Sequence, residues 1–588
     1  MKGKVRLPVH FLLLFALAAV SQSSWPQEPT RKQAAGGEPL QQVPPQSWIV
    51  PLDSPVYQQV EELFITRGLV PPLEETPVIA EDLRNRIDRL IERDRRVETT
   101  KKARSIRGEL VLPFPYISPI LALGLSLDLN TETGRDHTIP SNAARGGEFL
   151  DYMSMYEINR IPSIAKFGFV AQIAGFSLLF QPELRESVHS QLEDFDWINV
   201  PFDPIGIDNN FPYRGIAAFF HPPVELRFGR DKLNLGPGKW STLTLTKHMP
   251  YFDYAKARLF SGGFSFSWYL IRLNPTLNED EGKYMQDMYD GLISNPEPNA
   301  PMNGLSYIER SKHYIIGKLT VTPFDWLTFS VAQTNLVGGR DPELSDLNPL
   351  IVFHNLYAEG TYSVPLSITA TVVPFRGLKL YGDYLFYDAA VGDEKDPEVN
   401  PSAMAYQVGL TFLSDPYFTL FGGRFRFDAE FSYVDPWVYG KYYSLRQFTS
   451  RFIYVEHYVG RTWVDYPLGF YLGPDSLELN LAMAYGIPGD KEVELWYSLR
   501  GRGEVQLSGY GDENDYLHAG EPGYPLKGTP TGTAEWTNQI QLTFRWTPVD
   551  GLRLESWYRI RHVTNRYNEA GEDFVFHDLG VSGIWTIY

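Results

Sequence analysis

Cysteine is absent from the 588 residues of this chain. Its absence excludes a disulfide framework, thiolate chemistry and metal sites with cysteine ligands. Long apolar runs are also missing, since no stretch of about 18 apolar residues follows the N-terminal region, and a helical membrane protein is therefore excluded. Basic residues are fewer than acidic ones: the chain has 53 Lys and Arg and 71 Asp and Glu, and its formal net charge is −18. Nucleic acid is not expected as a partner, since its phosphates would be repelled.

Aromatic residues, in contrast, make up 14% of the chain. Many of them lie in runs that are also rich in β-branched residues, and three similar turns, at residues 322–327, 373–378 and 547–552, join pairs of such runs. Each turn contains a proline, which favours a tight turn and cannot donate to a ladder of hydrogen bonds. These turns predict hairpins between long antiparallel strands, the pattern of a transmembrane β-barrel with short turns at one end and long loops at the other.

Strands and loops are expected throughout residues 108–588. In residues 424–433 aromatic and charged residues alternate, so we expect Phe425, Phe427 and Phe431 to face lipid and the charged residues between them to line a polar interior. The other clear strands are predicted at residues 264–273, 313–321, 327–333, 378–387, 406–412, 477–485, 492–499, 539–546, 552–561 and 574–588.

The strand number should be even, because both ends of the barrel domain are expected on the periplasmic side. Roughly 25 residues for each strand and its share of loops suggest 16 to 20 strands, with about 18 as the central value. The excursion that contains residues 338–342 and 348–350 is then extracellular. Tyr588 supplies the terminal aromatic residue expected for recognition by the barrel-assembly machinery, although it is one residue out of phase with the apolar face of its strand. A soluble secreted β protein is the alternative, because the alternation of a barrel strand is a weak pattern.

The N-terminal region is expected to contain an export signal and a small helical element. Residues 1–21 have a charged start and a short apolar core, which predict a cleaved signal peptide and export to the cell outer membrane. Residues 22–53 resemble a flexible linker. Residues 54–107 predict a periplasmic helical hairpin and possible plug, with Ser54 as the N-cap of its first helix and Gly68 as the terminator. The second helix is amphipathic and rich in arginine, so it is either a solvated helical partner or an element whose cations dock against acidic groups at the barrel mouth.

One segment carries a resemblance to a known family. Residues 228–240 (FGRDKLNLGPGKW) and the small-residue strand 241–246 that follows are similar to a region of Wzi-like capsule-assembly outer-membrane proteins. Further matches lie at residues 51–57, 348–350 and 381–384, and together they spread over most of residues 51–588. The second helix with its basic tail and the long loops at 274–310 and 511–535 depart from the family pattern.

The resemblance implies a large barrel that acts as a non-enzymatic surface receptor for capsular or other exopolysaccharide. Aromatic faces and planar polar groups suit sugars, and the extracellular segments supply both types, at Tyr284, Tyr289, His354, Asn355, Tyr510, Asp512 and Tyr516. An Arg-Asp pair inside a barrel can equally tie the wall to a plug. The candidates for ligand binding or plug contact are Arg230, Asp231, Gly236, Pro237, Gly238, Trp240, Asn348, Pro349, His354 and Asn355.

Two other functions stay open at this point. A diffusion channel or substrate-specific porin needs an open polar lumen, whereas a receptor is expected to be closed by helices or inward loops. An enzyme is less favoured, because the 11 histidines show neither a paired metal-binding spacing nor a nucleophile motif, although His313, His354 and His457 could each meet a carboxylate. We therefore expect no catalytic residue, metal or cofactor, with outer-membrane lipid and a polysaccharide as partners.

Overall fold

The structure is a computed structural model. It describes residues 46–111, 116–118, 121–135, 163–185, 196–198, 214–277, 281–283, 286, 311–351, 364–388, 403–414, 423–440, 444–456, 460–487, 489–505, 507, 528–549 and 551–587. The predicted signal peptide, most of the predicted linker and Tyr588 lie outside the described residues. Within the described part of the chain, no helix is long and apolar enough to cross a membrane.

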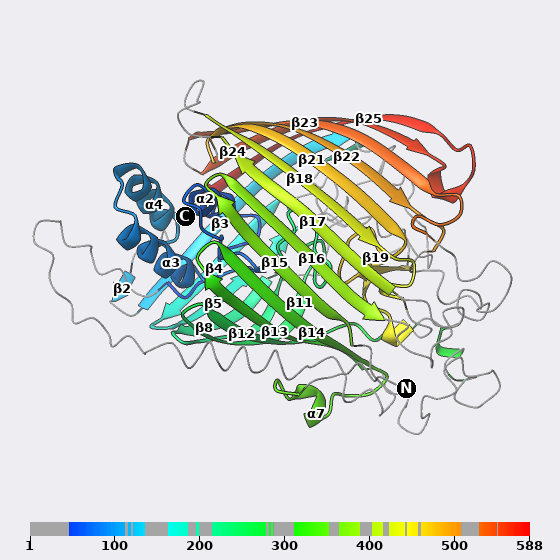
Figure 1. Cartoon of the computed structure of the whole chain (residues 1–588), viewed down its shortest axis with the longest axis horizontal. Coiled ribbons are helices and arrows are strands. Elements are labelled where there is room, and N and C mark those ends of the chain that lie inside the picture. The colour runs from blue at the N-terminus through cyan, green and yellow to red at the C-terminus, as the bar shows by residue number, and fades with distance from the viewer. Residues whose placement is uncertain are drawn as a thin grey trace, which may run out of the picture. The chain divides into compact units, whose positions relative to one another are not determined.

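Eighteen antiparallel strands form a closed barrel, in which the last strand pairs with the first. The count and the even number agree with the prediction. All eleven strands predicted individually are present, and the three proline turns each join two neighbouring strands (Figure 1). Around the barrel the strands are β3 (Leu121–Arg135), β4 (Ala165–Ile173), β5 (Phe176–Gln181), β8 (Arg214–His221), β9 (Val224–Asp231), β11 (Phe252–Ser261), β12 (Phe264–Arg272), β13 (Lys312–Phe324), β14 (Leu327–Gly338), β15 (Leu366–Phe375), β16 (Leu378–Asp388), β17 (Ala403–Leu413), β18 (Arg424–Val434), β21 (Ser476–Ile487), β22 (Lys491–Arg502), β23 (Glu535–Val549), β24 (Leu552–Thr564) and β25 (Phe574–Ile587).

The shorter elements add to this wall or lie apart from it. Short strands β2 (Tyr116–Ser118), β6 (Glu183–Leu184) and β7 (Asp196–Ile198) pair with β3 or β4. Two further sheets are separate from the barrel, and they consist of β1 (Glu75–Thr76) with β10 (Asn234–Leu235) and of β19 (Thr449–Glu456) with β20 (Gly460–Pro467). Further short helices in the described part of the chain are α7 (Leu344–Leu347), η4 (Ser444–Arg446) and η6 (Arg566–Asn568).

The outer face of the barrel carries an apolar belt. In β18 the exposed or half-buried positions alternate with buried ones, and the buried ones include Arg426, Asp428 and Glu430, as predicted. Large apolar side chains are exposed on the opposite, outward face of strand after strand, and they include Phe169, Phe180, Phe228, Leu259, Leu380, Leu495, Ile540, Leu542, Ile560, Val581 and Trp585. Such a continuous exposed apolar surface suits the hydrocarbon of a bilayer and not water.

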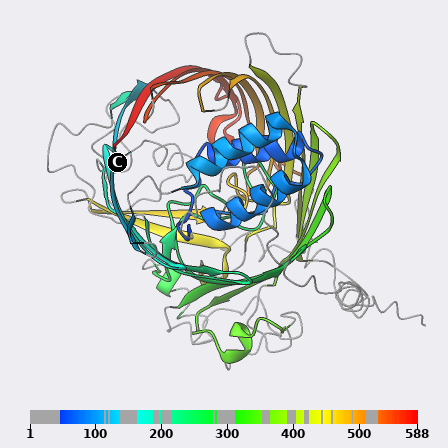
Figure 2. The ribbon, with the colours of Figure 1, turned by 90° about the vertical axis from the view of Figure 1, so that its left-hand side faces the viewer.

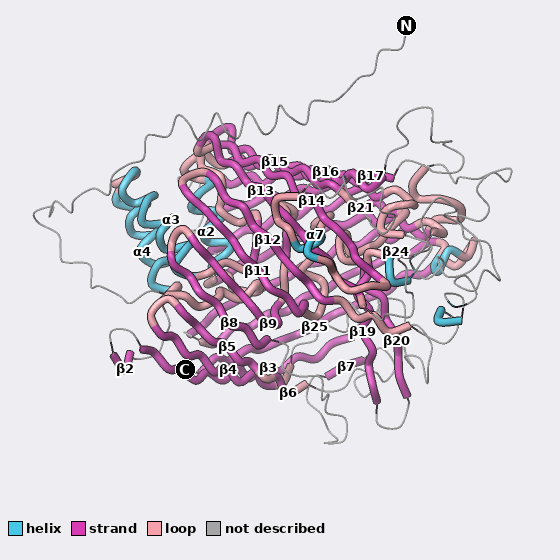
Figure 3. The backbone as a smooth tube through the Cα atoms, turned by 90° about the horizontal axis from the view of Figure 1, so that it is seen from below, coloured by secondary structure: helices cyan, strands magenta, loops and turns pink. Residues whose placement is uncertain are grey.

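The two ends of the barrel differ. At the end called the turn end here, most strand pairs are joined by two or three residues, among them 222–223, 262–263, 325–326, 376–377, 488–490 and 550–551. At the opposite loop end the connections are long. Three helices gather at the turn end (Figures 1 and 3), and Figure 2 shows them lying across the barrel opening.

These helices are α2 (Val56–Ile65), α3 (Ala80–Arg93) and α4 (Val97–Glu109). The N-cap of α2 is Pro55 and not the predicted Ser54, whose hydroxyl lies before the helix and accepts a hydrogen bond from the backbone N–H of Val56 at 3.3 Å. Gly68 follows the end of α2 with φ of +77°. The third helix was not predicted, because its apolar positions are few and its cations resemble a solvated tail. Ala103, Ile106 and Leu110 nevertheless pack against α2 and α3 in an apolar cluster.

Residues 46–53 differ from the flexible linker that was expected. Ile49 and Val50 are fully buried, and the backbone N–H of Val50 donates to the carbonyl of Val78. The reason is a short apolar run, residues 48–50, inside a segment whose composition is otherwise dominated by proline and glutamine. The structured part of the N-terminal region therefore begins by residue 46, and residues 46–110 are called the N-terminal segment below.

Candidate functional site

Among the described residues, three segments of the chain lie in the lumen of the barrel. The first is the N-terminal segment, and the others are connections that fold inward from the loop end. The first inward loop comprises residues 232–251, between β9 and β11. The second inward loop comprises residues 435–475, between β18 and β21, of which 441–443 and 457–459 lie outside the described residues.

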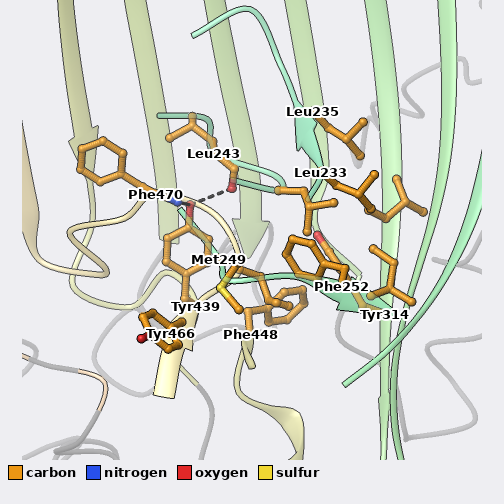
Figure 4. Packing of buried hydrophobic residues seen from close by; sticks show 14 of the residues in the cluster. Leu233, Leu235, Leu243, Met249, Phe252, Tyr314, Tyr439, Phe448, Tyr466 and Phe470 are labelled. Atoms are coloured by element: carbon orange, nitrogen blue, oxygen red, sulfur yellow. Dashed lines mark hydrogen bonds between the residues drawn. The ribbon is translucent and has the colours of Figure 1, made fainter. Parts of the chain in front are cut away.

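The two inward loops form an apolar core with part of the wall. The hydroxyl of Tyr439 donates to the carbonyl of Leu243 at 2.7 Å and accepts from the backbone N–H of Phe470 at 2.9 Å (Figure 4). Around this point Met249, Phe448 and further side chains are buried against inward-facing residues of the wall. The wall residues of the cluster come from β8, β11–β14 and β16–β18, and they include Ile216, Tyr254, Tyr269, Tyr314, Leu336, Leu385 and Val434. Strands β8–β18 are therefore called the packed sector.

The N-terminal segment is tied to the wall by ion pairs. Glu61 pairs with Lys379 and, at 2.6 Å, with Arg426. Asp82 pairs with Arg258 at 2.9 Å and Glu75 with Lys256 at 3.2 Å. The sequence predicted a different arrangement, in which cations of the second helix either stay solvated or dock against acids of the barrel. Arg93 of α3 does meet Asp325 at 2.7 Å. Glu61, Glu75 and Asp82, however, are acids of the N-terminal segment that contact cations of the wall.

These partners change the acidity of the docking groups. Burial by itself raises the pKa of Glu61, Glu75 and Asp82, but the neighbouring cations outweigh burial and hold each pKa at about 2. All three side chains are therefore charged at neutral pH. In the first inward loop, removal from bulk water lowers the pKa of Lys247 to about 8, although Glu430 acts in the opposite direction.

The predicted Gly-Pro-Gly loop lies inside the barrel. Residues 236–240 line a cavity of about 690 Å³ near the turn end, between the N-terminal segment and the wall. The backbone N–H of Gly236 donates to the carbonyl of Glu74 at 3.1 Å, and Lys239 reaches Asp428 of β18 at 2.5 Å. The Lys239 ammonium lies 4.8 Å from the centre of the Trp240 ring. Gly236, Pro237, Gly238 and Trp240 thus share one site.

Arg230 and Asp231 point to opposite faces of β9 and do not pair with each other. Asp231 faces inward and accepts from Arg214 at 2.7 and 3.0 Å. Arg230 faces outward, pairs with Asp253 at 2.7 Å and lies 3.8 Å from the centre of the Tyr251 ring. The expectation of an Arg-Asp tie between wall and plug fails because adjacent residues of a strand alternate across it. Asp231 links two wall strands instead, and any ligand contact of Arg230 would be at the outer rim.

The remaining candidates lie elsewhere. Asn348 and Pro349 follow α7 at the loop end, and the Asn348 amide oxygen accepts from the backbone N–H of Leu350 at 3.0 Å. These two residues share no site with the Gly-Pro-Gly loop or with Arg230. His354 and Asn355 lie outside the described residues, as do Tyr284, Tyr289, His457, Tyr510, Asp512 and Tyr516.

A second large cavity lies mainly beside strands that contribute no buried residue to the apolar core, with β8 as the exception. It has a volume of about 980 Å³ and is lined in part by Asp53, Asp128, Lys166, Arg553 and Glu555. Its wall strands are β3–β5, β8, β24 and β25, and the cavity of about 690 Å³ shares Asp53 and Arg553 with it. Strands β21–β25 and β3–β5, whose inward positions are largely polar, are called the polar sector below.

Several inward residues of the polar sector were missed by the sequence reasoning. Arg545 contacts Glu492, Glu494 and Glu555, with distances of 2.9, 3.5 and 2.8 Å. Trp496 and Trp557 also face inward. The sequence does contain a signal for these residues. If every second position of β22–β24 is assigned to the lumen, Arg545, Trp496 and Trp557 fall on the inward face.

Among the described residues, no group of three or more His, Asp or Glu side chains is arranged to hold a metal ion. The described lumen offers ion pairs, amides, hydroxyls and aromatic rings. Such groups bind by hydrogen bonding and stacking.

The closed barrel, its apolar belt and its polar interior define the class: this is a transmembrane β-barrel of the outer-membrane type, with internal segments in its lumen. Among solved structures, the fold is similar to that of Wzi from Escherichia coli, described as an outer-membrane protein involved in group 1 capsule assembly and a carbohydrate-binding β-barrel. The two chains are 13% identical over 92% of this chain and 99% of that chain, with a TM-score of 0.54. The predicted resemblance is thereby confirmed for the fold.

Other solved barrels are less similar. OccK5 (OpdH) from Pseudomonas aeruginosa is 13% identical over 81% of this chain and 100% of that chain, with a TM-score of 0.39. The outer membrane channel DcaP from Acinetobacter baumannii is 11% identical over 81% and 100% of the two chains, with a TM-score of 0.32. No protein-family model and no curated sequence matches the chain.

Proposed function

We propose that this protein is an outer-membrane surface receptor that binds or organises capsular or other exopolysaccharide and is not an enzyme. The observation that carries the proposal is the apolar core that the two inward loops build against the packed sector. A diffusion pathway requires a wet, polar lumen, whereas buried Leu, Tyr and Phe side chains exclude water from this part of the lumen. A barrel with such a filling is suited to presenting a binding surface.

A pocket at the rim of the loop end supplies suitable chemistry for sugars. It has a volume of about 310 Å³, and its lining includes Tyr251, Asp253, Arg272, Arg451 and Phe452. The rings of Tyr251 and Phe452 are 5.1 Å apart at 75°. Aromatic faces stack on the apolar faces of sugar rings, and charged planar groups take pairs of hydroxyls. In our proposal the loop end is extracellular, and the N-terminal segment faces the periplasm.

The likeness to Wzi, which its description calls carbohydrate binding, is a further support. We propose in addition that residues 1–21 direct export and that the barrel-assembly machinery inserts the mature protein. These steps follow from the expected signal peptide and from the membrane fold.

A channel for small polar solutes is the second candidate, and one observation favours it. The cavities of about 690 and 980 Å³ are both lined in part by charged side chains, among them Asp53 and Arg553, and both border β24 and β25. A continuous path through them would conduct ions.

The two candidates are separated by paired measurements on the mature, folded protein. A receptor is expected to give no stable open steps in a planar bilayer and to retain fluorescent exopolysaccharide on vesicles that contain it. The receptor proposal would be overturned in favour of a channel by regular open conductance steps that are blocked by added oligosaccharides, if the vesicles also retain no polysaccharide. Empty vesicles and vesicles with an unrelated refolded barrel are the controls.

A further inference from the structure

Two tryptophans of the polar sector face the lumen. Trp496 lies on β22 and Trp557 on β24, and both are half-buried. Their neighbours Leu495 and Tyr558 are exposed on the outer face, at 41% and 44%, so alternation directs the two indoles inward. An interfacial aromatic belt faces lipid, and it therefore does not account for these two residues.

The strand register places the two rings on either side of β23. Trp496 is paired with Gln541, and Trp557 is paired with Thr543 of the same strand. Since Gln541 and Thr543 are two residues apart, the backbones of the two tryptophans differ by roughly 7 Å along the strands and about 10 Å across them. A single ligand chain of a few rings can reach both.

The environment of each ring fixes its orientation. Trp557 lies against the backbone of Gly580, because a Cβ at this glycine would come within 2.6 Å of the indole Cε2 and Nε1 atoms. The indole N–H of Trp496 donates to the amide oxygen of Asn480 at 3.0 Å. Guanidinium groups lie near both rings, since Arg559 is 5.2 Å from the centre of Trp557 and Arg500 is 5.7 Å from that of Trp496.

Buried amides beside the tryptophans lack hydrogen-bond partners among the described atoms. Gln539, which precedes Gln541 by one inward position, is 1% exposed, and neither its amide oxygen nor its amide nitrogen is paired. The amide nitrogen of Asn480, also 1% exposed, is unpaired as well. Unsatisfied buried amides are costly and call for a partner. An amide that offers a donor and an acceptor side by side matches two adjacent hydroxyls of a sugar ring.

The tryptophans also continue the walls of the two cavities. Glu494 lines the cavity of about 690 Å³, and Glu555 lines that of about 980 Å³. Trp496 and Trp557 are the next inward positions of the same strands toward the loop end. A chain that enters from the loop end would meet the two rings before it meets the acidic wall beneath them.

We propose that Trp496, Trp557, Gln539, Gln541 and Asn480 form a lumenal subsite for a pyranose oligosaccharide, in which the indoles stack on sugar rings and the amides bind hydroxyls. This subsite deepens the proposed receptor function and rests on it. It assigns part of the binding to the inner wall of the barrel, away from the rim pocket at Tyr251. A chain held at both places would thread its end into the lumen.

Calorimetric titration of the mature, folded protein tests the subsite with two probes, maltohexaose as a neutral chain and hexagalacturonate as an acidic one. W496A and W557A are each expected to weaken binding of the preferred probe about tenfold, since a lost stacking contact costs of the order of one such factor. The matched control is W585A on β25, because Trp585 is 53% exposed on the lipid face. This variant should bind the probe as the wild type does.

A thiol-labelling measurement tests the subsite without removing either tryptophan, so it still applies if W496A or W557A fails to fold. Because the chain has no cysteine, E555C places a single thiol one inward position from Trp557, where the side chain is 34% exposed, and bound oligosaccharide should slow its modification by a small charged thiol reagent. T586C, which lies in the cavities nearer the turn end, is the comparison site. If the wild type binds a probe, W496A and W557A bind it equally well and the sugar does not protect E555C, the subsite is overturned and the receptor function still stands. If the wild type binds neither probe and also retains no polysaccharide on vesicles, both the subsite and the receptor function are overturned.

Discussion

Gly238 shows how closely the first inward loop approaches the wall. A Cβ at this position would lie 1.9 Å from the carbonyl oxygen of Ser241 and 2.4 Å from the amide oxygen of Gln407. G238A is therefore expected to displace the loop and to destabilise the protein by about 1–3 kcal/mol. Denaturant unfolding of the protein in lipid vesicles measures the change. G108A, in α4, is the control, since a Cβ there meets nothing within 4 Å; equal stability of the two variants would contradict the close approach.

Arg230 shows what residue-level reasoning misjudged. The sequence placed it next to Asp231 and a glycine-rich loop, and this suggested one functional group of residues. Strand geometry separates them, because Asp231 faces the lumen beside Arg214 while Arg230 faces outward beside Asp253. The Gly-Pro-Gly loop lies inside the barrel, where Gly236 contacts Glu74 and the adjoining Lys239 contacts Asp428.

At the level of elements, the N-terminal segment should detach in acid. The pKa values of Glu61, Glu75 and Asp82 are about 2 in the folded protein, against ordinary values of 4.5, 4.5 and 3.8. Groups with a lowered pKa stabilise docking fully above their ordinary pKa, and this stabilisation is lost as the pH falls through the folded value. We therefore expect docking to weaken between about pH 4.5 and pH 2.

Limited proteolysis with an acid-active protease, followed over this pH range, reports the exposure of residues 46–110. E61Q should shift the onset to higher pH, since it leaves Lys379 and Arg426 without their common acid. E92Q, at an exposed position of α3, should leave the onset unchanged. A segment as resistant at pH 2.5 as at pH 7 would show that these ion pairs do not hold it.

At the level of the whole molecule, the apolar belt predicts a depth-dependent cost of charge. Ile540 is 52% exposed on the outer face near the middle of β23, so I540R should destabilise the barrel by about 2–4 kcal/mol. H562R, an outward position near the loop end of β24, should cost about 0–1 kcal/mol. Equilibrium refolding into vesicles measures both. Equal costs would mean that the belt does not face hydrocarbon.

The sequence by itself determined the barrel wall. Alternating strands such as β18, proline turns and the spacing between them specify an even, antiparallel barrel of about 18 strands, because these signals are local and a strand repeats every two residues. The first two helices could also be predicted, since a terminating glycine and an apolar stripe are local features, although α2 begins at Val56 with Pro55 and not Ser54 at its N-cap.

Only the tertiary structure decided what fills the wall. Whether a loop folds inward depends on contacts between residues far apart, such as Tyr439 with Leu243 and Glu61 with Arg426. The sign of the docking charges, the separation of Arg230 from the Gly-Pro-Gly loop and the placement of Trp496 and Trp557 on either side of β23 depend on strand order and register. These relations arise when the barrel closes, and no short stretch of sequence contains them.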